Sequence, residues 1–135
     1  MKQDNGIYDK RNKLNDLTGK EWLKLTASYW FSEKCKLDKP ALKHPAPFMV
    51  KDIEKLIKFF TKSNMTVLDP FCGSGTTLVS AYNTNRKGIG IDLSKEYYEL
   101  AKERLLNMGA DEFEDFKYFI GNNTDVIETL NSNSI

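Results

Sequence analysis

The chain has 135 residues, 20 Lys and Arg against 19 Asp and Glu, and a formal net charge of +1, which allows one domain of ordinary size. With 40% hydrophobic and 29% charged residues, its composition is that of a globular protein and excludes a disordered or membrane-embedded chain. It has no apolar run near the roughly 18 residues of a spanning helix and no signal-peptide core, so we expect a cytoplasmic protein with no membrane partner.

The start of the chain is polar. Residues 1–20 are rich in Asn, Lys and Asp, and we expect them to be a loosely held lead-in to a domain formed by residues 21–135. Residues 21–31 follow with an aromatic cluster that includes Trp22, Tyr29, Trp30 and Phe31. Because such a cluster is too apolar to be left in water, it is expected to be packed.

A proline-rich segment comes next. Three of the four prolines fall within residues 40–48, PALKHPAPF, and this predicts an extended, fairly rigid loop because proline lacks an amide donor. After it, Ile53, Leu56, Ile57 and Phe60 follow the i, i+3, i+4, i+7 spacing of an amphipathic helix. This helix is expected to end near residues 63–64 and to cover one face of a sheet.

From residue 65 onward, strands and helices alternate. Strands are predicted at residues 65–69, 88–92 and 116–120, and helices at residues 76–83, 94–108 and 124–130. The βαβαβα order predicts an α/β fold with a parallel sheet, equivalent to half of a doubly wound sheet.

Charge and reactive side chains are unevenly distributed. Residues 1–62 hold 14 basic and 8 acidic side chains, whereas residues 63–135 hold 6 and 11. A basic front half suits a polyanion, but lysines that only solvate helix faces would give the same pattern.

Cys35 and Cys72 form no CxxC motif and His44 is the single histidine, so no disulfide framework, metal site or Ser/His/Asp triad is predicted.

The segment between the first strand and its helix carries the strongest functional signal. It reads VLDPFCGSGTT over residues 67–77. Gly73 and Gly75 remove side chains where a ligand would approach the backbone, and the first amides of the helix present a partial positive charge. The pattern predicts a site for an anionic group.

Other residues narrow the choice of ligand. A dinucleotide-binding turn would have glycine where this chain has Leu78, and the Gly-Lys-Ser/Thr of a P-loop does not occur. Asp92 ends the next strand, 17 residues after Gly75, where a carboxylate can accept hydrogen bonds from both hydroxyls of a ribose. The ligand is therefore predicted to contain a nucleoside.

The two segments DPFCGSGTT and GIGIDLSKEYYELAKERL resemble the S-adenosyl-L-methionine-binding half of the DNA amino-methyltransferases, which modify adenine N6 or cytosine N4. The resemblance covers roughly residues 22–130 and implies a Rossmann-like methyltransferase fold with S-adenosyl-L-methionine as cofactor. In that family the Phe-x-Gly-x-Gly turn holds the methionine part, and the acid after the second strand holds the ribose. The resemblance thus implies the following cofactor-binding residues: Asp69, Pro70, Phe71, Gly73, Ser74, Gly75, Thr76, Thr77, Asp92 and Leu93.

The proline segment extends the resemblance. The family places a His-Pro-x-x-Phe/Pro element before the helix that leads to the glycine turn, and His44, Pro45 and Phe48 match it, with Trp30 resembling a tryptophan upstream. The resemblance implies that this loop covers the cofactor, with Phe48 near the methionine part and His44 structural rather than catalytic.

The third strand is followed by a departure from the family. There the family usually has Gly-Asp, whose carboxylate meets the adenine amino group of the cofactor, whereas this chain has Gly121-Asn122. Asn122 can still accept this hydrogen bond, but without a negative charge. Weaker binding of the adenine end is therefore expected.

The family's catalytic loop, Asp/Asn/Ser-Pro-Pro-Tyr/Phe after the fourth strand, has no counterpart in the sequence, because the prolines stand at 40, 45, 47 and 70. In the family this loop grips the amino group that receives the methyl and stacks on a base flipped out of the duplex. The resemblance therefore implies no catalytic residue in these 135 residues and a domain interrupted before that loop.

From these features we expect the cofactor-binding part of a site-specific DNA methyltransferase of restriction-modification type that acts on double-stranded DNA. A C-terminal part or a second polypeptide would supply the catalytic loop and the target recognition. Two alternatives stay open: a non-catalytic cofactor-binding subunit of a split methyltransferase, and part of an RNA methyltransferase.

Overall fold

The computed structural model describes residues 6–43, 45–131 and 135. At its centre is a parallel sheet of three strands, β1 (Thr66–Asp69), β2 (Lys87–Asp92) and β3 (Phe116–Ile120), in the order β1-β2-β3. Asp69 is paired with Gly90, and Asp92 with Ile120. Because the strands run in the same direction, their carboxyl ends meet at one edge of the sheet.

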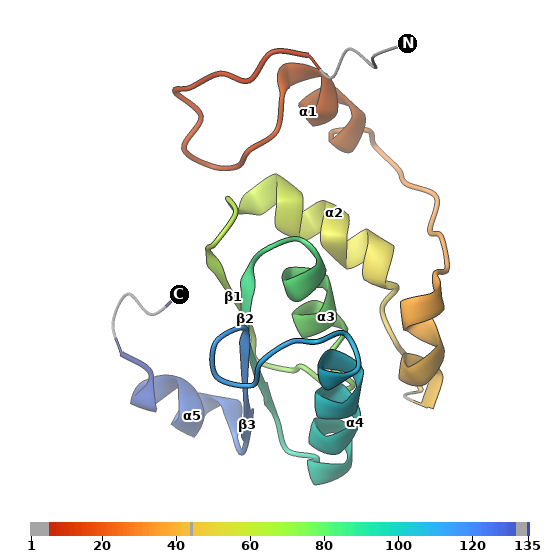
Figure 1. Cartoon of the computed structure of the whole chain (residues 1–135), viewed down its shortest axis with the longest axis vertical. Helices are drawn as coiled ribbons and strands as arrows, with labels where there is room; N and C mark the ends of the chain where they lie inside the picture. Colours follow the sequence, from red (N-terminus) through yellow and green to blue (C-terminus); the bar gives the residue numbers. More distant parts are fainter. Residues whose placement is uncertain (1–5, 44, 132–134) are drawn as a thin grey trace.

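Helices lie on both faces of this sheet. Helices α3 (Thr76–Asn83) and α4 (Lys95–Leu106) lie on one face, and α5 (Asn123–Thr129) lies on the other (Figure 1). Helix α3 approaches β2 closely, since a Cβ atom on Gly88 would lie 2.5 Å from a methyl carbon of Leu78. The buried core on this side includes Val50, Cys72, Leu78, Val79, Leu105, Ala110 and Phe116.

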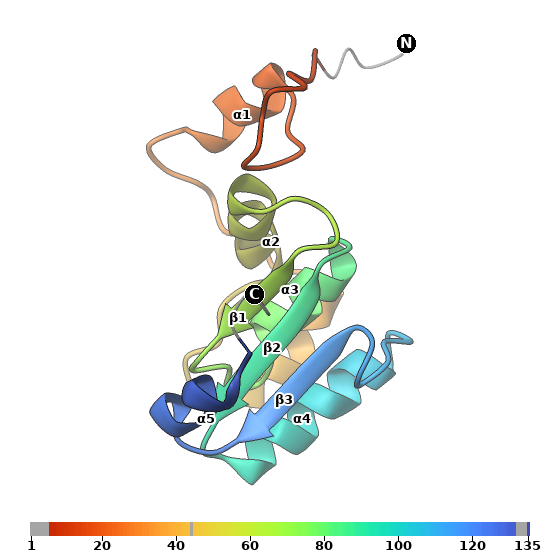
Figure 2. The same cartoon turned by 90° about the vertical axis from the view of Figure 1, so that its left-hand side faces the viewer.

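The predicted α/β fold is confirmed. Each strand and helix expected after residue 64 is present, and its ends agree with the prediction within two residues. The placement of α3 and α4 on one face and of α5 on the other (Figure 2) is that of half a doubly wound sheet. Within the described part of the chain, no helix has the length and apolar character needed to cross a membrane.

Helix α2 (Val50–Phe60) confirms the amphipathic helix but ends earlier than predicted. It packs mainly against α3 rather than on the sheet. Val50 and Ile57 are buried, whereas Leu56 and Phe60 of the predicted apolar face are 40% and 59% exposed. The buried stripe of α2 is narrower than predicted, because a neighbouring helix covers less of its surface than a sheet would.

The prediction of an extended loop is wrong for the first part of the proline segment. Residues 36–43 form a 3-10 helix, η1 (Lys36–Lys43), which includes Pro40. The fixed φ of proline is compatible with this helix type. The buried carboxylate of Asp38 also accepts hydrogen bonds from the amides of Cys35 (2.5 Å) and Val50 (2.8 Å), which ties η1 to the start of α2.

The aromatic cluster is only partly packed. Helix α1 (Gly19–Leu25) places Trp22 against Phe59 of α2, with ring centroids 4.6 Å apart. The chain then runs to η1 as an irregular connection on the outside of the molecule (Figure 1). The expected packing is wrong for this connection, where three aromatic side chains are between 37% and 79% exposed: Tyr29, Trp30 and Phe31.

The last part of the lead-in, residues 12–16, is not loosely held, contrary to the prediction, whereas residues 1–5 lie outside the described residues. Asn15 is fully buried, and its Nδ2 donates to the carbonyl of Phe59 at 2.5 Å. Asp16 accepts a hydrogen bond from the amide of Ser63 (2.7 Å) and lies 3.8 Å from the guanidinium of Arg86. These polar contacts, which hydropathy does not reveal, fix residues 12–16 to the end of α2.

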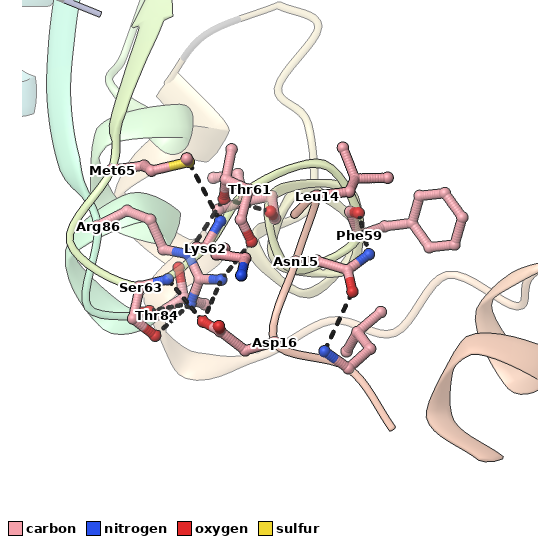
Figure 3. A network of polar contacts seen from close by, with 12 residues as sticks. Leu14, Asn15, Asp16, Phe59, Thr61, Lys62, Ser63, Met65, Thr84 and Arg86 are labelled. Carbon is pink, nitrogen blue, oxygen red and sulfur yellow. Dashed lines mark hydrogen bonds and ion pairs between the residues drawn. The ribbon is translucent and has the colours of Figure 1, made fainter. Parts of the chain in front are cut away.

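Arg86 is at the centre of these contacts, just before β2 (Figure 3). Its side chain is 6% exposed and donates to the carbonyls of Thr61 (2.7 Å) and Thr84 (2.6 Å). We call Asn15, Asp16 and Arg86 with their partners the Arg86 network. It lies at the amino ends of the strands, opposite the edge to which the predicted site belongs.

Candidate functional site

A cavity of about 190 Å³ lies at the carboxyl ends of the strands. The side chains of Phe71 and Leu93 beside it are 78% and 75% exposed, so apolar surface lies next to the carboxylate of Asp92. The lining comes from the segments after all three strands: Pro70, Phe71, Asp92, Leu93, Gly121, Asn122 and Asn123. The structure thus brings together residues that were predicted from separate motifs.

Two other cavities are larger but lie elsewhere. One of about 240 Å³ follows the amino-terminal parts of β2 and β3, and one of about 340 Å³ lies between α1 and α2. Neither is lined by a residue of the glycine turn or by Asp92. The cavity at the strand ends is therefore the candidate site. We choose it by the chemistry of its lining residues and not by its volume.

The glycine turn, residues 70–75, is held by three neighbouring elements. The carboxylate of Asp92, at the end of β2, accepts a hydrogen bond from the amide of Gly73 at 2.9 Å. The hydroxyl of Tyr118, in β3, donates to the carbonyl of Gly73 at 2.7 Å. Arg104, in α4, donates to the carbonyl of Ser74 at 2.6 Å. Side chains of β2, β3 and α4 therefore fix the turn before any ligand binds.

Asp92 keeps free hydrogen-bond acceptor positions, which its predicted role of binding a ribose requires. One of its carboxylate oxygens accepts from Gly73 and the other from the amide of Ser94, each at 2.9 Å. Since an ionised carboxylate offers about four acceptor positions, each oxygen retains one. Asp92 is half-buried at the cavity wall and can accept hydrogen bonds from two hydroxyl groups of a ribose.

Gly75 is required for a reason other than the predicted one. Its φ is +79°, and an added Cβ atom would lie 2.5 Å from the Cβ of Ala101 in α4. Both the left-handed conformation and the close approach of α4 demand glycine. The expectation that Gly75 makes room for a ligand is therefore wrong, because this space is filled by the protein.

Four other predicted residues support the turn rather than line the cavity. Ser74 and Thr76 are buried, and the Nη1 of Arg104 lies 3.5 Å from the Ser74 hydroxyl and 3.2 Å from that of Thr76. The carboxylate of Asp69 accepts a hydrogen bond from the hydroxyl of Thr77. These contacts fix the start of α3, whose first amides have no partner within the helix.

Two titratable groups beneath the turn stay protonated. Burial raises the pKa of the Cys72 thiol well above its ordinary value, and the charges of Asp69 and Asp92 act in the same direction. Burial also raises the pKa of Tyr118, with further contributions from Cys72, Asp92 and Asp69. Tyr118 therefore remains a hydrogen-bond donor, and Cys72 is not a thiolate nucleophile.

The remaining predicted residues lie at the edge of the site or away from it. Asn122 immediately precedes α5, and its side-chain oxygen accepts a hydrogen bond from the amide of Thr124 at 2.9 Å, so this oxygen also serves as a helix cap. Pro45 and Phe48 are exposed and do not line the cavity, and His44 lies outside the described residues. Over the described ranges, there is no group of three or more His, Cys, Asp or Glu side chains able to hold a metal ion.

Comparison with known proteins gives the family. The DNA methylase family model matches residues 1–103. This chain belongs to the DNA methylase family. The match confirms the resemblance that the glycine turn and the segment around Asp92 indicate.

Individual methyltransferases that are similar to this chain agree with this assignment. The orphan methyltransferase M.BamHII of Bacillus amyloliquefaciens is 48% identical over 75 residues, which are 56% of this chain and 28% of that protein. The type II methyltransferase M2.DpnII of Streptococcus pneumoniae is 41% identical over 98 residues, 73% of this chain and 35% of that protein. The chain therefore spans about a third or less of the length of these relatives.

A solved structure shares the fold. TTHA0409 from Thermus thermophilus, solved in complex with S-adenosyl-L-methionine, matches with a TM-score of 0.58 and 28% identity. The match covers 78% of this chain and 39% of that one. The predicted Rossmann-like methyltransferase fold is confirmed in its partial form.

Sequence reasoning missed Tyr118 and Arg104, although both hold the turn. The sequence does contain an indication of the role of Arg104. Leu100, Ala101 and Leu105 define a buried stripe of α4, and Arg104 lies on that stripe. A charged residue on an apolar stripe indicates a buried polar contact. Tyr118 in β3 gives no comparable signal, because an aromatic residue is ordinary in a strand.

Proposed function

We propose that this chain is the cofactor-binding part of a DNA methyltransferase that transfers a methyl group from S-adenosyl-L-methionine to an exocyclic amino group, adenine N6 or cytosine N4. The proposal rests on one observation, the cavity in which Phe71, Asp92 and Asn122 meet at the carboxyl ends of the three strands. The family match over residues 1–103 and the complex of TTHA0409 with S-adenosyl-L-methionine support the same cofactor.

Each part of the cavity has a proposed role. Asp92 accepts hydrogen bonds from the ribose hydroxyls, and the exposed side chains of Phe71 and Leu93 provide apolar surface for the purine ring. Asn122 contacts the adenine edge, with Pro70 and Phe71 at the start of the turn beside it. The glycine turn leads directly into α3, whose first amides are proposed to bind the methionine carboxylate.

The cofactor, when bound, supplies an electrophilic methyl group. The residues of this chain bind and orient it, which contributes proximity rather than acid or base catalysis. No covalent enzyme intermediate is proposed, and the protonated, buried Cys72 agrees with this. The segment with His44, Pro45 and Phe48 is proposed to cover the methionine part, and the 71% exposed ring of Phe48 supplies apolar surface for that purpose.

The rest of the enzyme is proposed to provide the catalytic loop and target recognition on double-stranded DNA. It is either a C-terminal part or a second polypeptide, in agreement with the 28% and 35% of M.BamHII and M2.DpnII that this chain covers. We place the enzyme in the cytoplasm, where its DNA substrate is accessible. The match to a DNA methylase family gives no support to the RNA alternative.

Cofactor binding is tested by calorimetric titration of the chain with S-adenosyl-L-methionine. Asp92→Asn is expected to raise the Kd about tenfold or more, because one charged acceptor for two hydroxyls is lost. The matched control is Asp115→Asn, which alters a carboxylate that accepts the Asp111 amide at 2.8 Å before β3 and should leave the Kd unchanged. A folded chain that gives no binding heat with the cofactor would contradict the proposal.

The reaction is tested with isotope-labelled cofactor and duplex DNA. The chain alone is expected to transfer no label, and the chain combined with the remainder of the enzyme is expected to label adenine N6 or cytosine N4. Label on DNA from the chain alone would refute the absence of the catalytic loop, and label on RNA only would refute the DNA substrate.

A further inference from the structure

The guanidinium of Arg104 joins two segments that are distant in sequence. Its Nη1 donates to the carbonyl of Ser74 in the glycine turn at 2.6 Å, and its Nη2 donates to the carbonyl of Leu37 in η1 at 3.1 Å. The side chain is 5% exposed. One rigid, planar group therefore fixes the distance between the turn and the segment that leads to Pro45 and Phe48.

A buried cation at this position is costly, and a leucine on the same stripe of α4 would avoid the cost. Burial lowers the pKa of the Arg104 guanidinium, and the nearby charge of Asp38 opposes this, but an arginine side chain remains protonated. Asp38 is itself buried and holds the amides of Cys35 and Val50. What arginine adds over leucine is a fork of donors with fixed directions.

We propose that Arg104 is a positioning residue for cofactor binding, which keeps the glycine turn in a fixed relation to η1, the element that precedes the segment proposed to cover the cofactor. The inference rests on the proposed function of the site. Arg104 acts through the carbonyl of Ser74, and the preceding residue, Gly73, is the one that Asp92 and Tyr118 also hold. Without Arg104, the turn can shift and the carboxylate of Asp92 loses its fixed place.

Arg86 provides a matched control within the same chain. It is 7% exposed and donates to two backbone carbonyls, of Thr61 at 2.7 Å and of Thr84 at 2.6 Å. It also faces a carboxylate, that of Asp16, at 3.8 Å. Because the Arg86 network lies at the amino ends of the strands (Figure 3), its loss affects stability without touching the site.

The experiment compares Arg104→Met, Arg104→Lys and Arg86→Met in the full chain. Three quantities are measured: the Kd for S-adenosyl-L-methionine, the thermal midpoint, and amide hydrogen exchange in residues 36–43 and 73–76. Both methionine variants are expected to lower the midpoint. Arg104→Met alone is expected to raise the Kd about tenfold or more, similar to the loss caused at metal sites by removal of a residue that orients a ligand, and to speed exchange in both segments. Arg104→Lys keeps the charge but not the fork, so its Kd should stay raised.

Distinct results overturn distinct claims. An unchanged Kd in Arg104→Met, together with tight binding by the unaltered chain, would overturn the role of Arg104 and leave the proposed function intact. A wild-type Kd in Arg104→Lys would overturn the bridging geometry, and this variant carries the test if Arg104→Met does not fold. No binding by the unaltered chain would overturn the proposed function and, with it, the role of Arg104.

Discussion

Replacement of Gly75 by alanine tests the packing of the glycine turn against α4. The new Cβ would lie 2.5 Å from the Cβ of Ala101 and 3.2 Å from its Cα, at a φ of +79°. The left-handed conformation costs an alanine about 1–2 kcal/mol. Overpacking against α4 adds about 1–3 kcal/mol. Gly75→Ala is therefore expected to lower the free energy of unfolding by about 2–5 kcal/mol.

Alanine substitutions at two other glycines separate the backbone cost from the cost of overpacking. Gly109 has a φ of +86°, but a Cβ there would meet only the Tyr82 hydroxyl at 3.9 Å, so Gly109→Ala should cost about 1–2 kcal/mol for the backbone alone. Gly19 is the first residue of α1 and has nothing within 4 Å of an added Cβ. Gly19→Ala should be neutral or slightly stabilising.

Urea unfolding followed by circular dichroism measures all three variants, with the slope m as a check that the unfolding transition is unchanged. A double-mutant cycle with Ala101→Gly isolates the steric contact. Since Ala101→Gly removes the clashing methyl, Gly75→Ala should cost less in that background than in the wild type. Equal losses for Gly75→Ala and Gly109→Ala, or strict additivity in the cycle, would refute the proposed contact between the turn and α4.

Three further changes have specific expected outcomes. Asp92→Asn leaves one acceptor oxygen for the amides of Gly73 and Ser94, so a loss of about 1–3 kcal/mol in unfolding free energy is expected by urea titration; unchanged stability would contradict these bonds. Asn122→Asp keeps the helix cap and adds a negative charge beside the adenine edge of the cofactor. Calorimetry should therefore show S-adenosyl-L-methionine binding about fivefold tighter. Weaker binding would contradict the proposed contact of Asn122 with the adenine edge. Burial on its own would raise the pKa of Asp38, but hydrogen bonds from the amides of Val50 and Cys35, together with the Cys35 side chain and the charge of Arg104, hold this pKa below its ordinary value of 3.8. Its ionised form therefore adds stability above about pH 4 that is lost as the pH falls through the lower folded value. Asp38→Asn should accordingly be less stable at pH 7, by an amount that shrinks in acid unfolding curves; a constant difference would contradict this.

The sheet and its turn were predictable because their signals are local. The strand at residues 66–69 is followed at once by Pro70 and the glycines of the turn, and Asp92 ends the next strand. A parallel sheet brings both ends to one edge whatever the rest of the chain does. The position of the candidate site therefore follows from topology alone.

The failures involve residues whose surroundings come from distant parts of the chain. Tyr29 and Phe31 are aromatic, but no helix or sheet of the described residues covers them. Pro40 occurs in η1 because Asp38 holds amides on either side of that helix. The need for glycine at position 75 of the turn depends on Ala101, which lies 26 residues later in α4. Hydropathy and spacing carry no information about such partners.

The Arg86 network predicts an order of folding events during synthesis. Asn15 and Asp16 leave the ribosome first, but their partners Phe59 and Ser63 lie 44 and 47 residues later, and Arg86 follows only before β2. Closing such long loops for polar contacts alone is unfavourable until the partners are already in place. We therefore expect residues 12–16 to dock after α2 and β2 have formed. Loss of Asp16 should then speed unfolding and leave the folding rate nearly unchanged.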